Sequence, residues 1–111
     1  MDIELKTWIY DMLTAIHEIE TFLLDVPDFN AYQSDLKTKR AIERNLEIIG
    51  EAMHRVLKKD SSIQFSNSRR IVETRNRIIH GYDTVSDEIL WSIIMTHIPI
   101  LKQETEQYLS E

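Results

Sequence analysis

Apolar side chains recur at steps of three and four residues along most of this 111-residue chain, and this spacing limits its fold more than any other feature. The spacing lines up apolar side chains along one face of a helix, because an α-helix has about 3.6 residues per turn. Only two glycines and two prolines interrupt the pattern, which leaves little sequence for turns. The sequence therefore predicts an all-α protein with short connections.

Four helices are predicted, and their ends carry recognisable signals. Ser66 or Asn67 can cap the third helix, Gly81 can end it, and Ser86 can cap the fourth. Pro99 lies inside the fourth helix and is expected to kink it, because proline lacks an amide donor. The predicted helices cover approximately residues 3–24, 36–60, 68–80 and 87–109. We expect them to form one antiparallel four-helix bundle, a single domain over residues 1–111.

Gly50 lies in the middle of the second predicted helix. A glycine there costs about 1 kcal/mol of helix stability relative to alanine. We therefore expect another backbone to approach the helix closely at Gly50.

Composition restricts the class of protein further. The chain has no cysteine, no run of about 20 apolar residues and an acidic start, which predicts a soluble cytoplasmic protein. Its net charge is −6, but residues 54–80 contain seven Lys or Arg against two Asp or Glu, a net of +5 that leaves −11 elsewhere. This basic stretch could face phosphate, or it could be a solvated helix face.

The residues best suited to proton and phosphate chemistry lie at the end of the third predicted helix. Asn76 and His80 are four residues apart, so they share a helix face and Asn76 can orient the imidazole. Gly81 ends the helix immediately after His80, beside carbonyl groups that favour a protonated imidazole. Histidine is also the side chain that most readily exchanges protons near neutral pH.

Arg75 and His80 together supply the residue types that RNA cleavage requires. Cleavage without a metal needs a base for the ribose 2′-hydroxyl, an acid for the leaving 5′-oxygen and a cation for the charge on phosphorus. Arginine suits the last role because its planar fork can hold two phosphate oxygens. One histidine cannot easily be both acid and base, so a homodimer that pairs two copies is the expected solution.

Three segments of the chain resemble one known family. Arg75-x4-His80-x-Tyr82 resembles the signature of HepT-like toxins, a branch of the HEPN superfamily of helical ribonucleases and nucleotide-binding domains. The run LEIIGEA at residues 46–52 and the run VSDEILW at residues 85–91 resemble the flanking segments of that branch. In this order the three segments are far more specific than the Arg-x4-His spacing alone.

The resemblance implies a homodimeric, metal-independent endoribonuclease toxin with the motifs of both protomers facing one cleft. It also implies a partner, a minimal nucleotidyltransferase antitoxin that silences the toxin by transferring AMP to the motif tyrosine, Tyr82. Esterifying this phenol two residues from His80 would add negative charge and bulk where the RNA phosphate should lie.

Supporting roles are predicted for three further residues. Glu51 either pairs with Arg55, four residues later, or orients Arg75 across the bundle. Arg77 and Arg70 are expected to bind RNA away from the cleavage point. The remaining histidines lack a second ligand at zinc spacing, so we predict neither a metal site nor a cofactor.

Other interpretations of the same residues stay open. His80 could be an ordinary histidine at a helix end, Arg75 a structural ion-pair partner of Glu51, and Tyr82 an unmodified packed side chain. For the whole protein, the alternative is a non-catalytic helical dimer that binds nucleotide as the partner subunit of a nucleotidyltransferase. A purely structural dimer is a third possibility.

Overall fold

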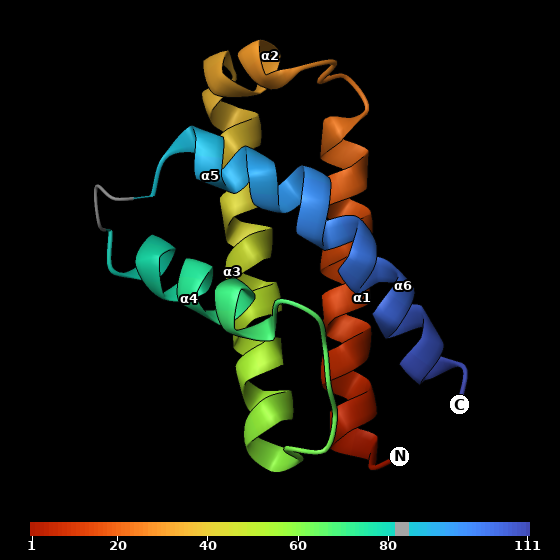
Figure 1. Cartoon of the computed structure of the whole chain (residues 1–111). Coiled ribbons are helices and arrows are strands. Elements are labelled where there is room, and N and C mark those ends of the chain that lie inside the picture. Colours follow the sequence, from red (N-terminus) through yellow and green to blue (C-terminus); the bar gives the residue numbers. More distant parts are fainter. Residues whose placement is uncertain (82–84) are drawn as a thin grey trace.

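Two long antiparallel helices form the centre of the fold. The computed structural model describes residues 1–81 and 85–111, and its α1 (Ile3–Leu23) and α3 (Leu36–Lys59) lie side by side (Figure 1). A carboxylate caps each of them: Asp2 accepts from the amide of Glu4 at 2.8 Å, and Asp35 accepts from the amide of Thr38 at 3.1 Å. The predicted bounds of both helices are confirmed within one residue.

A short helix that the sequence pattern did not predict connects these two. α2 (Phe29–Ser34) begins at Asp28, whose carboxylate accepts from the amide of Ala31 at 2.9 Å. Tyr32 anchors it, because the ring is fully buried and packs 5.2 Å from the ring of Trp91, measured between centroids. This helix lies against the ends of α3 and α5.

The helix that carries the motif, α4 (Ser68–Ile79), lies across α3 (Figure 1). Asn67 precedes it with a φ of 62°, and its side chain makes no capping hydrogen bond, so the predicted capping by Asn67 is wrong in its detail. Ser66 does not cap it either, because its amide and hydroxyl both bind Glu104. Gly81 follows the helix with a φ of 64°, the left-handed conformation that suits glycine after a helix end, as predicted.

The last helical stretch is continuous but irregular. It consists of α5 (Asp87–Ser92), the π-helical turn η1 (Ile93–His97) and α6 (Ile98–Leu109). Ser86 caps α5 as predicted, accepting from the amide of Ile89 at 3.2 Å. In η1 the amide of Ile98 donates to the carbonyl of Ile93, five residues earlier. Pro99, where a kink was expected, lies in the first turn of α6, directly after this π-helical turn.

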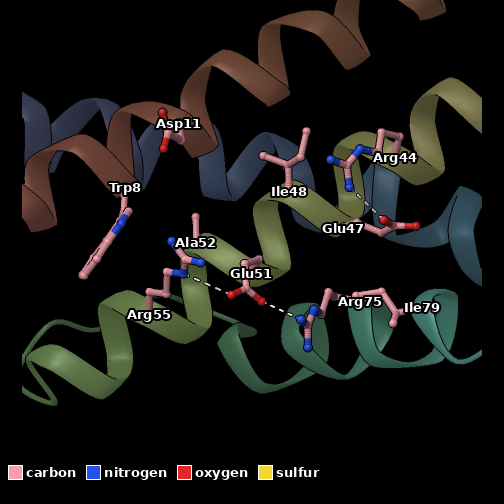
Figure 2. Close-up of a pocket in the computed structure, with 10 residues that line it drawn as sticks. All are labelled: Trp8, Asp11, Arg44, Glu47, Ile48, Glu51, Ala52, Arg55, Arg75 and Ile79. Carbon is pink, nitrogen blue, oxygen red and sulfur yellow. Dashed lines mark hydrogen bonds and ion pairs between the residues drawn. The ribbon is translucent and has the colours of Figure 1, made fainter.

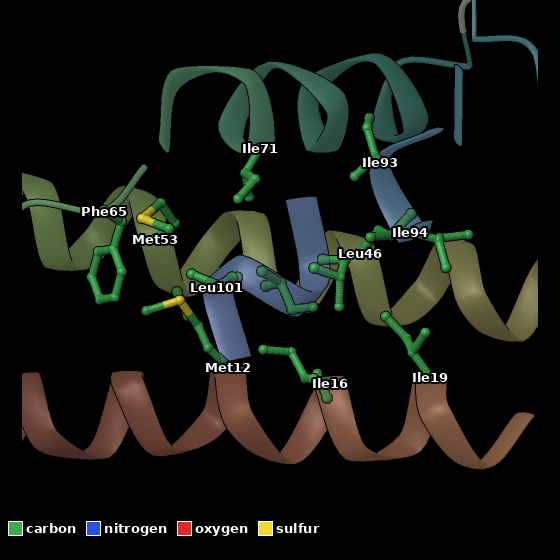
Figure 3. Packing of buried hydrophobic residues seen from close by; sticks show 14 of the residues in the cluster. Met12, Ile16, Ile19, Leu46, Met53, Phe65, Ile71, Ile93, Ile94 and Leu101 are labelled. Atoms are coloured by element: carbon green, nitrogen blue, oxygen red, sulfur yellow. The ribbon is translucent and has the colours of Figure 1, made fainter. Parts of the chain in front are cut away.

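The core fills the space between α1, α3 and the two helical segments that cross them (Figure 3). The all-α class is confirmed, whereas the predicted count of four helices is not, because α2 is added and the last helix is divided. Among the described residues, no helix is both long and apolar enough to cross a membrane. Side chains labelled in Figure 3 are Met12, Ile16, Ile19, Leu46, Met53, Phe65, Ile71, Ile93, Ile94 and Leu101.

Candidate active site

Arg75 lies where α4 crosses α3, directly over Gly50. A Cβ atom on Gly50 would overlap the Cβ of Arg75 and come within 2.9 Å of its Cγ and 3.2 Å of the carbonyl oxygen of Ile71. The close backbone approach predicted at Gly50 is therefore confirmed, and the approaching segment is the one that carries the motif arginine.

Two side chains hold the guanidinium of Arg75. Its Nη2 forms an ion pair with Oε2 of Glu51 at 2.6 Å, and its Nη1 donates to Oδ1 of Asn76 at 2.8 Å. The Nε atom is buried and has no hydrogen-bond partner in the part of the chain that the structure describes. Because 27% of the side chain remains exposed, the guanidinium is held in place and still reachable from solvent.

Glu51 makes both of the contacts that sequence reasoning treated as alternatives. Its Oε2 binds Arg75, and its Oε1 accepts from Nε of Arg55 at 3.0 Å (Figure 2). One carboxylate thus bridges a guanidinium on its own helix and another on α4. Arg55 therefore belongs to this network, although the sequence pointed to it only as a helical neighbour of Glu51.

A groove of about 310 Å³ opens beside this network, between α1, α3 and the last turn of α4. Three arginines and three carboxylates line it, so its formal charges balance. Ile79, 48% exposed, lies on its α4 side, and Trp8 lies on its α1 side. Sequence reasoning missed this α1 wall, since only the folded chain brings Trp8 near the motif. The lining residues are Trp8, Asp11, Arg44, Glu47, Ile48, Glu51, Ala52, Arg55, Arg75 and Ile79.

His80 is the exposed residue that ends α4. Its amide donates to the carbonyl of Asn76 at 3.1 Å, in the last turn of the helix. At about 100° per residue, Arg75 and His80 lie about 140° apart around the helix axis, and Asn76 lies between them. The side-chain oxygen of Asn76 is turned toward Arg75. The predicted modification site, Tyr82, lies outside the described residues.

Arg70 and Arg77 face the other side of α4. They line a second groove of about 150 Å³, together with Glu73, Thr74 and Ile89. Arg77 is paired with Glu73 at 3.0 Å, and Arg70 is exposed. The structure therefore brings Arg75, Asn76 and Glu51 together and places the two outer arginines in a separate groove.

Outside these grooves, His97 in the π-helical turn is a titratable group whose pKa is shifted by its surroundings. Burial and, secondly, the positive charge of Arg70 lower the pKa of His97 below its usual value. Its Nδ1 is buried without a hydrogen-bond partner among the described residues. Within residues 1–81 and 85–111, no group of three or more His, Cys, Asp or Glu side chains could hold a metal ion.

Comparison with known proteins places the chain in a family. The family described as "Ribonuclease HepT-like" matches residues 12–108. "Putative RNase MJ1380" of Methanocaldococcus jannaschii is 32% identical over 93% of this chain and 94% of its own length. "Probable ribonuclease HepT" of Thermococcus cleftensis is 32% identical over 92% of this chain and 93% of its own. No solved structure matches. The chain belongs to the HepT-like ribonuclease family.

Proposed function

We propose that this protein is a metal-independent endoribonuclease, the toxin of a type VII-like toxin–antitoxin system acting in the cytoplasm. The observation that carries the proposal is the placement of Arg75, held by two side chains yet partly exposed, on the same helix end as His80. In this proposal Arg75 stabilises the charge on the phosphate and His80 transfers protons. Asn76 lies between them and orients the imidazole in addition to holding Arg75.

The cleaving unit that we propose is a homodimer. A single protomer contributes one motif histidine, whereas cleavage with attack by the 2′-hydroxyl needs a base and an acid. A two-fold axis near the motif would bring two copies of His80 to one phosphate. The exposed Ile79 beside the charge-balanced groove supports such contact, because an apolar side chain and paired charges suit burial against a second copy.

Control by AMP transfer is the second part of the proposal. The acceptor is Tyr82, two residues after His80, and the donor enzyme is a minimal nucleotidyltransferase antitoxin. An adenylated phenol would bring a phosphodiester charge next to the site that must bind the RNA phosphate, which lowers RNA affinity.

Arg70 and Arg77 are proposed to bind the RNA strand outside the cleavage point. Their groove on the far side of α4 offers arginine side chains along one helix face. Such contacts contribute affinity that depends strongly on salt and little on sequence.

The test of this function is cleavage of total cellular RNA by the purified protein in EDTA. His80→Ala should lower the rate at least about 100-fold, which is the usual contribution of an acid–base residue. His54→Ala is the control, because His54 is an exposed histidine of α3 that does not line the groove. Wild-type protein that leaves RNA intact under these conditions, or His80→Ala that cuts as fast as wild type, would refute the proposal.

The modification is tested by intact-mass spectrometry after co-expression with a neighbouring nucleotidyltransferase. A gain of one or more AMP units that maps to Tyr82 and disappears in Tyr82→Phe supports this form of control. An unmodified Tyr82 in the silenced complex contradicts it.

One observation favours a second candidate function, a non-catalytic partner subunit that binds nucleotide. The groove next to Arg75 carries as many carboxylates as arginines, and the chain as a whole is acidic, which gives weak attraction for long RNA. This candidate predicts that the protein binds AMP or ATP in solution, with Arg75→Ala abolishing binding, and leaves RNA uncut.

A further inference from the structure

We infer that Glu51 is a positioning residue for Arg75, that Arg55 holds Glu51 in the required orientation, and that Gly50 provides the space for this arrangement. We call the contacts of Glu51 with Arg75 and Arg55 the clamp. These contacts are present whatever the chemistry at Arg75. The catalytic consequence of the clamp rests on the proposed ribonuclease function.

The contacts of Arg75 leave a defined part of its guanidinium available. Arginine has five N–H donors. The Nε donor is buried, Nη2 is ion-paired with Oε2 of Glu51, and Nη1 donates one proton to Asn76. Donors of the two Nη atoms that these contacts do not use remain for phosphate oxygens, and contacts at both Nη atoms oppose rotation of the group.

The second oxygen of Glu51 explains the role of Arg55. A carboxylate that bound only Arg75 could rotate and take the guanidinium with it. Here Oε1 binds Nε of Arg55, four residues later on the same helix, while Oε2 binds Arg75 (Figure 2). Both carboxylate oxygens are thus committed, and the side chain is held between two helices.

The magnitudes favour orientation over stability as the result of this network. The side chains of Arg55 and Glu51 are 55% and 36% exposed, and exposed ion pairs contribute only about 0–1 kcal/mol to folding. A catalytic cation is far more sensitive, since a displacement of about 1 Å can cost about 100-fold in rate. The clamp therefore affects cleavage much more than unfolding.

The backbone beneath Arg75 serves the same purpose. Gly50 and Glu51 are consecutive residues of α3. Gly50 leaves the space that Cβ and Cγ of Arg75 occupy, and the carboxylate of Glu51 binds the guanidinium. The side chain of Arg75 is thereby held both at Cβ and Cγ and at its guanidinium.

The experiment compares single-turnover cleavage and RNA binding for four forms of the dimer. Glu51→Gln should lower the cleavage rate about 10- to 100-fold and change the RNA dissociation constant less than about 3-fold. Arg55→Ala should lower the rate less, about 3- to 10-fold, because Glu51 still reaches Arg75. The control is Glu43→Gln, which breaks another ion pair of α3, the one with Arg40; neither residue lines the groove, so this variant should cleave like wild type.

The pH–rate profile separates positioning from direct proton transfer. Glu51→Gln should lower the whole profile without moving its acidic limb, because a positioning carboxylate takes no proton in the reaction. Loss of the acidic limb would make Glu51 the base and overturn the inference, as would cleavage by Glu51→Gln at the wild-type rate.

A measurement without RNA distinguishes failure of the clamp from failure of the ribonuclease proposal. Arginine side-chain ¹⁵N spectra of the wild-type dimer should show hindered rotation of the Arg75 guanidinium, and Glu51→Gln should release it. Release in Glu51→Gln together with an inactive wild type would refute the proposed function and leave the clamp intact. A freely rotating Arg75 in wild type would overturn the clamp itself.

Discussion

Gly50 and Arg75 occupy one crossing point, where the absent side chain of the first admits the Cβ and Cγ of the second. The contact joins the centre of α3 to the motif helix. Because the carbonyl of Ile71 also lies 3.2 Å from the position of the missing Cβ, any added atom presses on the backbone of α4 as well as on the arginine.

Replacing Gly50 by alanine should therefore destabilise the protein despite alanine's better helix propensity. The propensity gain is about 1 kcal/mol, whereas overpacking at a close crossing costs about 1–3 kcal/mol. We expect a net loss of up to about 2 kcal/mol in urea unfolding, together with slower RNA cleavage. A Gly50→Ala protein stabilised by the full propensity gain would show that the crossing has spare room.

Arg75→Lys should keep the positive charge and lose most of the activity. A lysine ammonium is a single point charge and cannot bind Glu51, Asn76 and a phosphate in the fixed directions of a guanidinium. We expect single-turnover cleavage to fall about 100-fold, with a melting temperature close to wild type. Activity within a few-fold of wild type would mean that charge alone is required at this position.

Removing Arg70 or Arg77 should weaken RNA binding without a comparable fall in the cleavage rate of bound RNA. Each lost phosphate contact should reduce the salt dependence of binding by about one unit of slope. Fluorescence anisotropy at several salt concentrations measures this slope. Arg40→Ala is the control, since Arg40 is an exposed arginine of α3 that lines neither groove. An equal loss of RNA affinity in Arg40→Ala would show that the effect comes from net charge alone.

The partly buried imidazole of His97 should make the fold sensitive to mild acid. Its pKa is lower in the folded protein than in the unfolded chain, where it is about 6.5, so below that pH the unfolded state binds the proton more readily. Stability should be constant above about pH 7 and should fall as the pH drops below about 6.5.

Urea unfolding between pH 7.5 and pH 5 measures this loss, and His97→Gln should flatten it. The other three histidines are present in both proteins and contribute equally to both curves. Parallel pH curves for wild type and His97→Gln would assign the acid sensitivity to another group.

Most of the fold could be predicted because its long helices are amphipathic and begin and end at recognisable residues. α1 and α3 follow the apolar spacing, and α5 begins directly after its cap Ser86 as expected. α2 was missed because six residues are too few to show a helical period. The π-helical turn was missed because it changes the backbone pairing of Ile98 and leaves no distinct side-chain pattern.

The site could be predicted where one helix carries it and only in part where two helices meet. Spacing along α4 related Arg75, Asn76 and His80, and the helix cost of Gly50 correctly indicated a close crossing. Spacing could not decide whether Glu51 binds Arg55 or Arg75, since that depends on the angle between α3 and α4. It also did not foresee that the side-chain oxygen of Asn76 binds Arg75.

The shared space at the crossing has a consequence for how such sequences diversify. Positions 50 and 75 cannot drift independently, because a larger residue at the first leaves no room for the stem of an arginine at the second. Substitutions at the two positions should be coupled among relatives, and a chain that retains Arg75 while losing Gly50 should carry a compensating shift between its helices. The motif that begins at Arg75 therefore depends on a further position 25 residues upstream, Gly50, where the absence of a side chain is what is required.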